Sequence, residues 1–225
     1  MMRNGTLHRY FLNNSDKRLH KWIHYFDIYE RHFQRFVYKK PVILEIGVAG
    51  GGSLQMWKEY FGEGSKVIGI DIDPKCKQFE DDNIEVFIGS QDDPNVINAI
   101  AEKYPSLDIV LDDGSHIMQH MKKSFELIYE QVSDNGVYMV EDTHTCYWES
   151  YGGGLRADHS FIEFAKSKID EINAVHTRGK VPVSLFTQST DSVIFYDSVV
   201  VFEKRKQGTR QALITAPMQQ HEKIK

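Results

Sequence analysis

Cysteine is scarce in this chain of 225 residues, which has only Cys76 and Cys146. The two occupy unlike sequence contexts and form no metal-type spacing, which argues against a disulfide framework and against a zinc site. We expect free thiols in a reducing cytoplasm. Cys146 lies close to an acidic cluster, but no base accompanies it in the sequence, so a small buried thiol is preferred over a nucleophile.

Long apolar runs and an excess of positive charge are also absent. No stretch is long and apolar enough to span a membrane, and the first residues lack the apolar segment of a signal peptide. The formal net charge of −5 gives no electrostatic reason to expect nucleic acid or an anionic membrane as a partner. We therefore expect a cytoplasmic protein with neither kind of partner.

Strand-like and helix-like segments alternate along the chain and end in two closely spaced strands. The length favours a single domain with elaborations, and the pattern predicts an α/β fold with a mostly parallel sheet and an antiparallel C-terminal hairpin. Asn135-Gly136 is expected to turn the chain into a strand over 137–140, and residues 173–190 are ambiguous. The predicted strands are 42–46, 66–73, 84–88, one from 107, 137–140, 192–196 and 198–202, and the predicted helices are 53–61, 96–104, 117–132 and 158–172, the last with Ile169 inward.

An additional amphipathic helix is predicted ahead of the sheet. It would begin at an N-cap in Asn14-Ser15-Asp16, because apolar residues then recur at three- and four-residue steps. Residues 1–13 show no clear period. Histidines and tyrosines on this helix could reach a site, but we interpret them as core. The recurring apolar residues are Trp22, Ile23, Phe26, Tyr29, Phe33, Phe36 and Val37.

These segments suggest three parts of the chain. Residues 1–40 form a helical extension, 41–204 the sheet domain, and 205–225 a polar tail in which 212–218 could add a strand or dock on a partner chain.

A glycine-rich turn follows the first predicted strand, with the pattern Glu45-x-Gly47-x-x-Gly50. Glycine lets the backbone approach a ligand, and the next helix begins with unpaired N–H groups. Asp71 ends the second strand roughly two dozen residues later, a spacing that suits a carboxylate on an adenosine ribose. The loop lacks Gly-x-Gly-x-x-Gly, the pattern expected of a dinucleotide-binding oxidoreductase. The carboxylate of Glu45 also disfavours a nearby pyrophosphate, but it suits the cationic methionine part of S-adenosylmethionine.

The third strand ends near Ser90 and Gln91, where an adenine edge would lie in such a fold. A solvated turn is the alternative.

Two further strands end in acidic residues followed by a histidine. Asp112-Asp113-Gly114-Ser115-His116 follows one strand and Glu141-Asp142-Thr143-His144 the next. Ligands bind at the carboxyl edge of open α/β sheets, and carboxylates gathered there need a positive partner, of which a divalent cation is the simplest. The alternative is that these acids only cap helices or turns.

The glycine loop, Asp71 and the terminal hairpin together resemble a class I S-adenosylmethionine-dependent methyltransferase. The two acidic motifs narrow the resemblance to metal-dependent sugar O-methyltransferases of macrolide and rhamnosyl-antibiotic pathways (mycinamicin and macrocin types), together with cephalosporin-hydroxylase-like proteins. The similarity spans about residues 15–204. It implies a Rossmann-like, seven-stranded methyltransferase sheet with helices on both faces.

The resemblance also implies a cofactor, a metal and a base. S-adenosylmethionine would bind at the glycine loop, Mg2+ or another divalent cation such as Mn2+ or Ca2+ at Asp113, Glu141 and Asp142, and His116 would remove a proton. His144 is a second candidate base. Asp112 is left open between a cofactor contact and an outer contact of the metal. The macrolide enzymes carry an extra N-terminal domain that this chain is too short to hold, which leaves acceptor size and oligomeric state open, although homo-oligomers are common in the family.

The expected activity is Mg2+-dependent transfer of a methyl group to a sugar hydroxyl of a glycoside, nucleotide sugar, or polysaccharide or natural-product precursor. Tyr147, Trp148 and Tyr151 lie on a loop with several glycines and are predicted to form an acceptor-binding lid, with a surface loop of no specific role as the alternative. A non-sugar hydroxyl, as in β-lactam-type products, and a non-catalytic cofactor-binding protein remain alternative functions.

Overall fold

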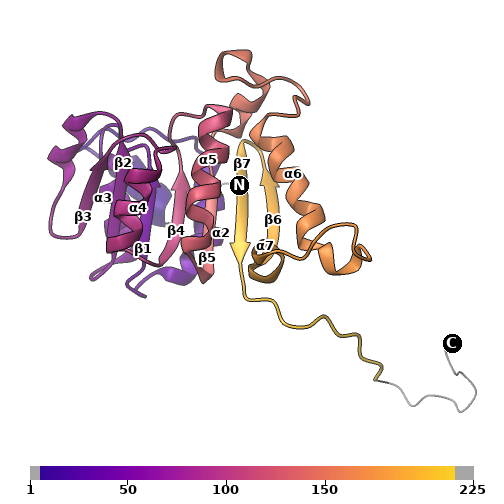
Figure 1. The fold of residues 1–225 in the computed structure, drawn as a ribbon. Helices are drawn as coiled ribbons and strands as arrows, with labels where there is room; N and C mark the ends of the chain where they lie inside the picture. The colour runs from indigo at the N-terminus through magenta and orange to yellow at the C-terminus, as the bar shows by residue number, and fades with distance from the viewer. Residues whose placement is uncertain (1–5, 216–225) are drawn as a thin grey trace, which may run out of the picture.

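The computed structural model describes residues 6–215, which are built around one seven-stranded sheet of order β3-β2-β1-β4-β5-β7-β6 (Figure 1). Strands β1 to β5 pair in parallel, whereas β7 is antiparallel to both β5 and β6. This confirms the predicted mostly parallel sheet and its C-terminal hairpin. The strands are β1 Val42–Ile46, β2 Lys66–Asp71, β3 Ile84–Ile88, β4 Leu107–Asp112, β5 Val132–Val140, β6 Thr190–Tyr196 and β7 Val199–Lys204.

Helices cover both faces of the sheet. Side chains alternate between the two faces along each strand, so apolar residues lie on both faces and are covered on both. Ile43 of β1 joins a core formed with α1, α2 and α3, and Leu44 joins the core formed with α4 to α7. The α-helices are α1 Thr6–Asn13, α2 Tyr25–Phe33, α3 Gly52–Phe61, α4 Pro94–Lys103, α5 Met118–Ile128, α6 Phe161–Ile172 and α7 Leu185–Ser189, and the 3-10 helices are η1 Gln34–Phe36, η2 Pro74–Phe79, η3 Tyr129–Gln131, η4 Thr143–Tyr147, η5 Glu149–Tyr151 and η6 Ala174–His176.

The N-terminal part of the chain differs from the predicted single long helix. Residues 6–13, which showed no period, form α1, and α2 begins only at Tyr25. Residues 14–24 contain no helix and cross the carboxyl edge of the sheet, where Arg18 O accepts a hydrogen bond from Gly52 N at 3.2 Å. We call residues 14–24 the N-terminal strap. Trp22 and Ile23 on this strap are exposed rather than buried, so the prediction that they lie in the core was wrong.

Smaller differences concern β5, α6 and the tail. The expected turn at Asn135-Gly136 lies inside β5, because Val132 already pairs with Leu107 before a register shift. Ile169 is 45% exposed, since α6 buries Phe161 and Ala165 instead. Residues 205–215 contain no regular element, and 216–218 of the possible extra strand lie outside the described residues. Among residues 6–215, no helix is long and apolar enough to cross a membrane.

Candidate active site

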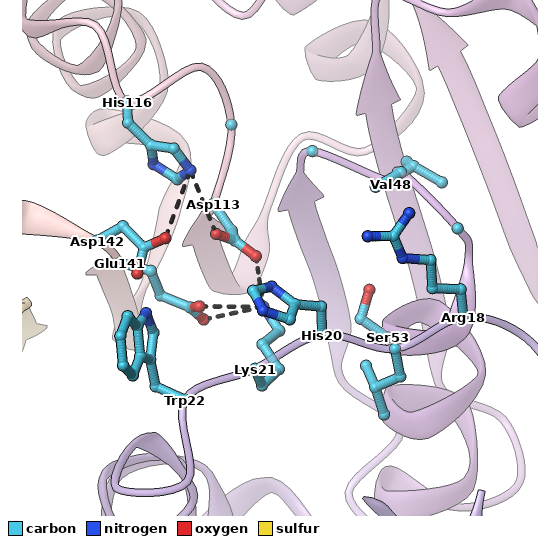
Figure 2. A pocket seen from close by; sticks show the side chains of 15 residues that line it. Arg18, His20, Lys21, Trp22, Val48, Ser53, Asp113, His116, Glu141 and Asp142 are labelled. Atoms are coloured by element: carbon cyan, nitrogen blue, oxygen red, sulfur yellow. Dashed lines mark hydrogen bonds and ion pairs between the residues drawn. The ribbon is translucent and has the colours of Figure 1, made fainter. Parts of the chain in front are cut away.

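The parallel register brings three strand ends to one place. Ile46 of β1 is paired with Asp112 of β4, and Asp112 is paired with Val140 of β5. The residues that follow these strand ends therefore meet at the same edge, around a cavity of about 530 Å³ (Figure 2). The cavity is lined by the N-terminal strap (Arg18, Leu19, His20, Lys21, Trp22), the glycine loop (Gly47, Val48, Ala49, Gly50, Ser53) and the acidic strand ends (Asp113, Gly114, His116, Glu141, Asp142).

Lys21 of the strap lies among the buried acids. Its ammonium Nζ is 2.6 Å from Asp113 Oδ2, 3.1 Å from Glu141 Oε2 and 3.6 Å from Glu45 Oε1. Burial by itself would lower the pKa of Lys21, but the negative charges of Asp113, Glu141 and Glu45 hold this pKa well above its ordinary value. The ammonium therefore stays charged and neutralises part of the cluster. This contact is not predictable from the sequence, because a lysine in an expected helix carries no signal that it will be buried.

Two tyrosines of α2 donate hydrogen bonds to the same group of acids. Tyr29 OH lies 2.5 Å from Glu141 Oε1, and Tyr25 OH lies 2.6 Å from Asp142 Oδ1. Residues four apart share one face of a helix, so α2 presents both hydroxyls together. Burial and the charge of Asp113 raise the pKa of Glu141, against the opposing effect of Lys21. These tyrosines are buried, as predicted, and they also fix the positions of the two carboxylates. The same prediction was wrong for His20 and His24, which are exposed.

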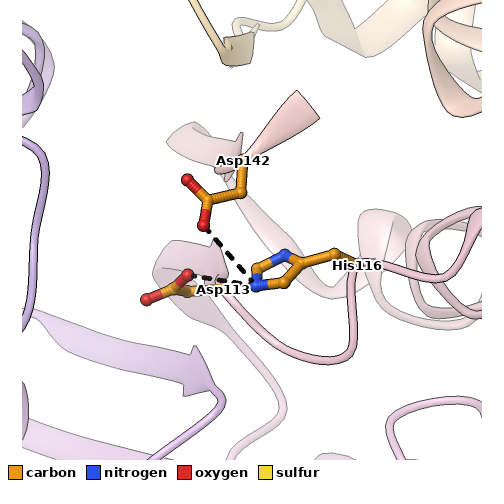
Figure 3. Close-up of side chains that lie close together, drawn as sticks. All are labelled: Asp113, His116 and Asp142. Atoms are coloured by element: carbon orange, nitrogen blue, oxygen red, sulfur yellow. Dashed lines mark ion pairs between the residues drawn. The ribbon is translucent and has the colours of Figure 1, made fainter. Parts of the chain in front are cut away.

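Asp113, His116 and Asp142 form a second, more accessible group (Figure 3). His116 Nε2 is 3.8 Å from Asp113 Oδ1 and 3.7 Å from Asp142 Oδ2. His116 and Asp142 have positive φ angles of 57° and 50°, a backbone conformation that is rare outside glycine and is often found at functional sites. The two carboxylates of this group suit Mg2+ or Mn2+.

The remaining predicted residues of the acidic motifs are placed differently. The Glu141 carboxylate faces Lys21 and Tyr29 rather than the group around His116. His144 Nδ1 lies 3.9 Å from Asp142 Oδ1, on the outer side of the site. The alternative that the acids only cap helices is not supported, since neither the start of α5 nor that of η4 has a side-chain cap from them.

Asp71 and Glu45 hold the glycine loop in its shape. Asp71 Oδ2 accepts hydrogen bonds from the N–H groups of Val48 and Ala49, both at 2.9 Å. Burial raises the pKa of Asp71, but backbone N–H donors outweigh this and leave it below its ordinary value. Glu45 is fully buried, and its Oε2 accepts a hydrogen bond from Ser53 Oγ at 2.7 Å. The other oxygen, Oε1, has no hydrogen-bond partner.

Gln91 and Asp112 lie behind the cavity and contact each other. Gln91 Nε2 donates to Asp112 Oδ1 at 3.0 Å, and Gln91 Oε1 accepts from Ser115 N at 2.8 Å. Burial raises the pKa of Asp112 to about 6. Ser90 donates to Asp92. The contacts of Gln91 with Asp112 and Ser115 brace the turn that carries Asp113 and His116.

Aromatic rings border the outer side of the cavity. Ring centroids are 5.9 Å apart between Trp22 and His144, 4.9 Å between His144 and Trp148, 5.9 Å between Trp148 and Tyr151, and 6.5 Å between Tyr151 and His116. Trp22 and Trp148 are each about half exposed. We call these five residues the aromatic arc; the predicted loop residue Tyr147 lies beside it and is also half exposed. Trp22 was predicted to lie in the core on a helix. It belongs to the aromatic arc instead, because the strap is not helical.

Comparison with known proteins agrees with this architecture. A family model described as rhamnosyl O-methyltransferase/CmcI matches residues 26–149. Demethylmacrocin O-methyltransferase of Streptomyces fradiae is 36% identical over 68% of this chain and 41% of its own length. A tetracenomycin rhamnosyl 3'-O-methyltransferase of Streptomyces olivaceus is 32% identical over 90% of this chain and 54% of its own length.

A solved structure gives the same result. The MycE methyltransferase of mycinamycin biosynthesis, in complex with Mg and SAH, is 31% identical, with a TM-score of 0.78 over 91% of this chain and 55% of that one. The chain thus spans about half the length of the relatives it matches. From the family model and these relatives, together with the acidic strand ends, the chain belongs to the rhamnosyl O-methyltransferase/CmcI family.

Proposed function

We propose that this protein is a divalent-cation-dependent O-methyltransferase that moves a methyl group from S-adenosylmethionine to a sugar hydroxyl. The acceptor would be a glycoside, a nucleotide sugar, or a polysaccharide or natural-product precursor. The observation that carries the proposal is one cavity bordered by both the glycine loop and the Asp113–His116–Asp142 group. The relatives act in macrolide and tetracenomycin pathways, and one MycE structure holds Mg, SAH and mycinamycin VI.

The glycine loop is the proposed cofactor site. Gly47 and Gly50 line the cavity, and the buried oxygen of Glu45 without a hydrogen-bond partner suits a cationic methionine portion nearby. Asp71 would contact the ribose and Ser90 the adenine edge, whereas Gln91 and Asp112 act through the turn that they brace. When bound, S-adenosylmethionine supplies a methyl group on a positively charged sulfur.

Asp113 and Asp142 are the proposed cation ligands in either of two arrangements. A bound divalent ion would lower the pKa of the acceptor hydroxyl and orient it. If Glu141 is the third ligand, His116 Nε2 is free to accept the proton of that hydroxyl. If His116 is the third ligand, the proton has to go to His144. We assign the base to His116, because His116 lines the cavity, whereas His144 does not.

The aromatic arc is the proposed acceptor platform. The apolar face of a sugar ring packs well on indole and phenol rings, and the arc leads directly to His116. Tyr147, Trp148 and Tyr151 come from the loop after β5, and Trp22 adds a ring from the strap. We also propose that the protein acts in the cytoplasm, since Cys76 and Cys146 are free thiols. A homo-oligomer is proposed only by analogy with the family.

The proposal is tested first with the cofactor. Calorimetric titration with S-adenosylhomocysteine, with and without Mg2+, should show micromolar binding, and NADH should not bind. A panel of rhamnosides, nucleotide sugars and non-sugar hydroxyl compounds then identifies the acceptor by the S-adenosylhomocysteine released. Transfer only to non-sugar hydroxyls would overturn the sugar assignment. Binding of the cofactor without turnover on any acceptor would favour a non-catalytic protein, and binding of NADH would overturn the methyltransferase assignment.

A further inference from the structure

The buried acids already have a cation bound to them, supplied by the chain itself. Lys21 Nζ lies 2.6 Å from Asp113 Oδ2 and within 3.2 Å of both carboxylate oxygens of Glu141. We infer that Lys21 is a resident cation that holds Asp113 and Glu141 together when no divalent ion is bound, and that a divalent ion using these carboxylates displaces it. The inference rests on the proposed metal site and deepens it.

Lys21 and a divalent ion cannot both bind the carboxylate of Glu141. Both carboxylate oxygens of Glu141 accept hydrogen bonds from Lys21 (Figure 2). Oε1 of Glu141 also accepts a hydrogen bond from Tyr29. An ion bound to this carboxylate would lie only a few ångströms from a buried ammonium. Like charges at that distance repel strongly where water is excluded. Glu141 therefore becomes a metal ligand only after Nζ has moved away.

Displacement of Lys21 selects between the two ligand arrangements. While Nζ holds Glu141, the group that remains near Asp142 consists of Asp113, His116 and Asp142. Once Nζ leaves, Glu141 is available as a metal ligand, and the imidazole of His116 is no longer needed to bind the ion. Lys21 is thus a positioning residue, which decides whether His116 contacts the ion or the acceptor.

The strap provides a place for the displaced ammonium. Lys21 lies in a stretch without helix that lines the cavity, so its side chain can turn into the open space. The displaced ammonium therefore leaves Asp113 and Glu141 for the cavity, so that cation binding is linked to the course of the strap.

The direct test measures Mn2+ affinity by electron paramagnetic resonance on the cofactor-free protein. Lys21→Met keeps the length of the side chain and removes the charge, so Mn2+ should bind at least about tenfold more tightly than to the wild type. The matched control is Lys204→Met, which removes another buried lysine whose Nζ contacts the carbonyls of Tyr129 and Val132. Its Mn2+ affinity should equal that of the wild type.

A second measurement uses the unmodified protein, in case Lys21→Met does not fold. Brief acetylation followed by peptide mass mapping reports the accessibility of each lysine. Saturating Mg2+ should raise the modification rate of Lys21 several-fold and leave that of Lys204 unchanged. An unchanged rate at Lys21 would overturn the inference.

The outcomes separate this inference from the proposed function. If the wild type binds Mn2+ and Lys21→Met binds it with equal or lower affinity, the inferred displacement of Lys21 is overturned and the proposed metal site is kept. Binding only to Lys21→Met supports displacement. Absence of Mn2+ binding in both proteins overturns the metal site and the inference together.

Discussion

Lys21 Nζ contacts Asp113 Oδ2 at 2.6 Å, although 92 residues separate the two in the chain. The contact joins the N-terminal strap to the end of β4, and Tyr25 and Tyr29 of α2 join it to the end of β5. The N-terminal part of the chain therefore completes the site and is more than an addition to the sheet.

Loss of the cation is expected to stop methyl transfer without stopping cofactor binding. Asp113→Asn or addition of EDTA should lower kcat by on the order of 10²–10³, because the acceptor hydroxyl loses its activating charge. Calorimetry with S-adenosylhomocysteine should give an unchanged affinity. Activity that survives both treatments would eliminate the metal role.

His116→Asn is expected to lower kcat by roughly 10²–10⁴, the usual contribution of a general base. The matched variant His144→Asn should have a much smaller effect, since its ring lies on the outer side of Asp142. Steady-state kinetics over a pH series compares the two. A larger loss for His144→Asn would assign the base to that residue and His116 to the metal.

Trp22→Ala and Trp148→Ala are each expected to raise the KM for the acceptor about three- to tenfold, with little change in kcat. Each removes one half-exposed ring of the aromatic arc. Leu185→Ala, on an exposed apolar residue of α7, serves as the control and should change neither parameter. An unaltered acceptor KM in both tryptophan variants would contradict the acceptor platform.

Gly47→Ala is expected to destabilise the protein by roughly 3 kcal/mol or more. Gly47 has a φ of +93°, and a Cβ there would lie 2.2 Å from the backbone oxygen of Asp113. Gly152→Ala also has positive φ but meets nothing within 4 Å, so it should lose only about 1–2 kcal/mol. Urea unfolding measures both, and equal losses would show that the close approach to Asp113 has no cost.

Glu203 should make the stability of the protein depend on pH. Burial would raise its pKa, but hydrogen bonds from His32 and Arg35 outweigh this and lower it. A carboxyl whose pKa is lower in the folded state contributes stability above its unfolded pKa of about 4.3. That contribution is lost as the pH falls from about 4.3 through the lowered folded value.

Glu203→Gln is therefore expected to show a shallower loss of stability below about pH 4.3 than the wild type. It should also be less stable at neutral pH, because the ion pair that joins Arg35 of η1 to β7 and the hydrogen bond that joins His32 of α2 to β7 are weakened. Chemical unfolding from pH 3 to pH 7 compares the two proteins. Parallel curves would mean that Glu203 has the same pKa in both states.

Much of the site could be predicted from local sequence. Strands that end in acids, such as those before Asp113 and Glu141, place these acids at one edge of any parallel sheet, because the carboxyl ends of parallel strands coincide. The helix after His116 was also predictable from its apolar spacing, and α5 begins at Met118. Its predicted end at residue 132 was wrong, since α5 ends at Ile128 and Val132 begins β5.

The sequence by itself therefore determined the α/β sheet, its hairpin and the edge at which the acidic motifs meet, since hydrophobic periodicity and strand ends are local features. Only the tertiary structure decided the course of the N-terminal strap, whose spacing had predicted a helix. Helix propensity differs by less than about 1 kcal/mol per residue among ordinary residues, so contacts made by the folded chain can override it. Here the contacts are those of one cation with Asp113 and with the buried carboxylates of Glu45 and Glu141. That cation is Lys21, and its long-range contacts have no signature in the neighbouring sequence.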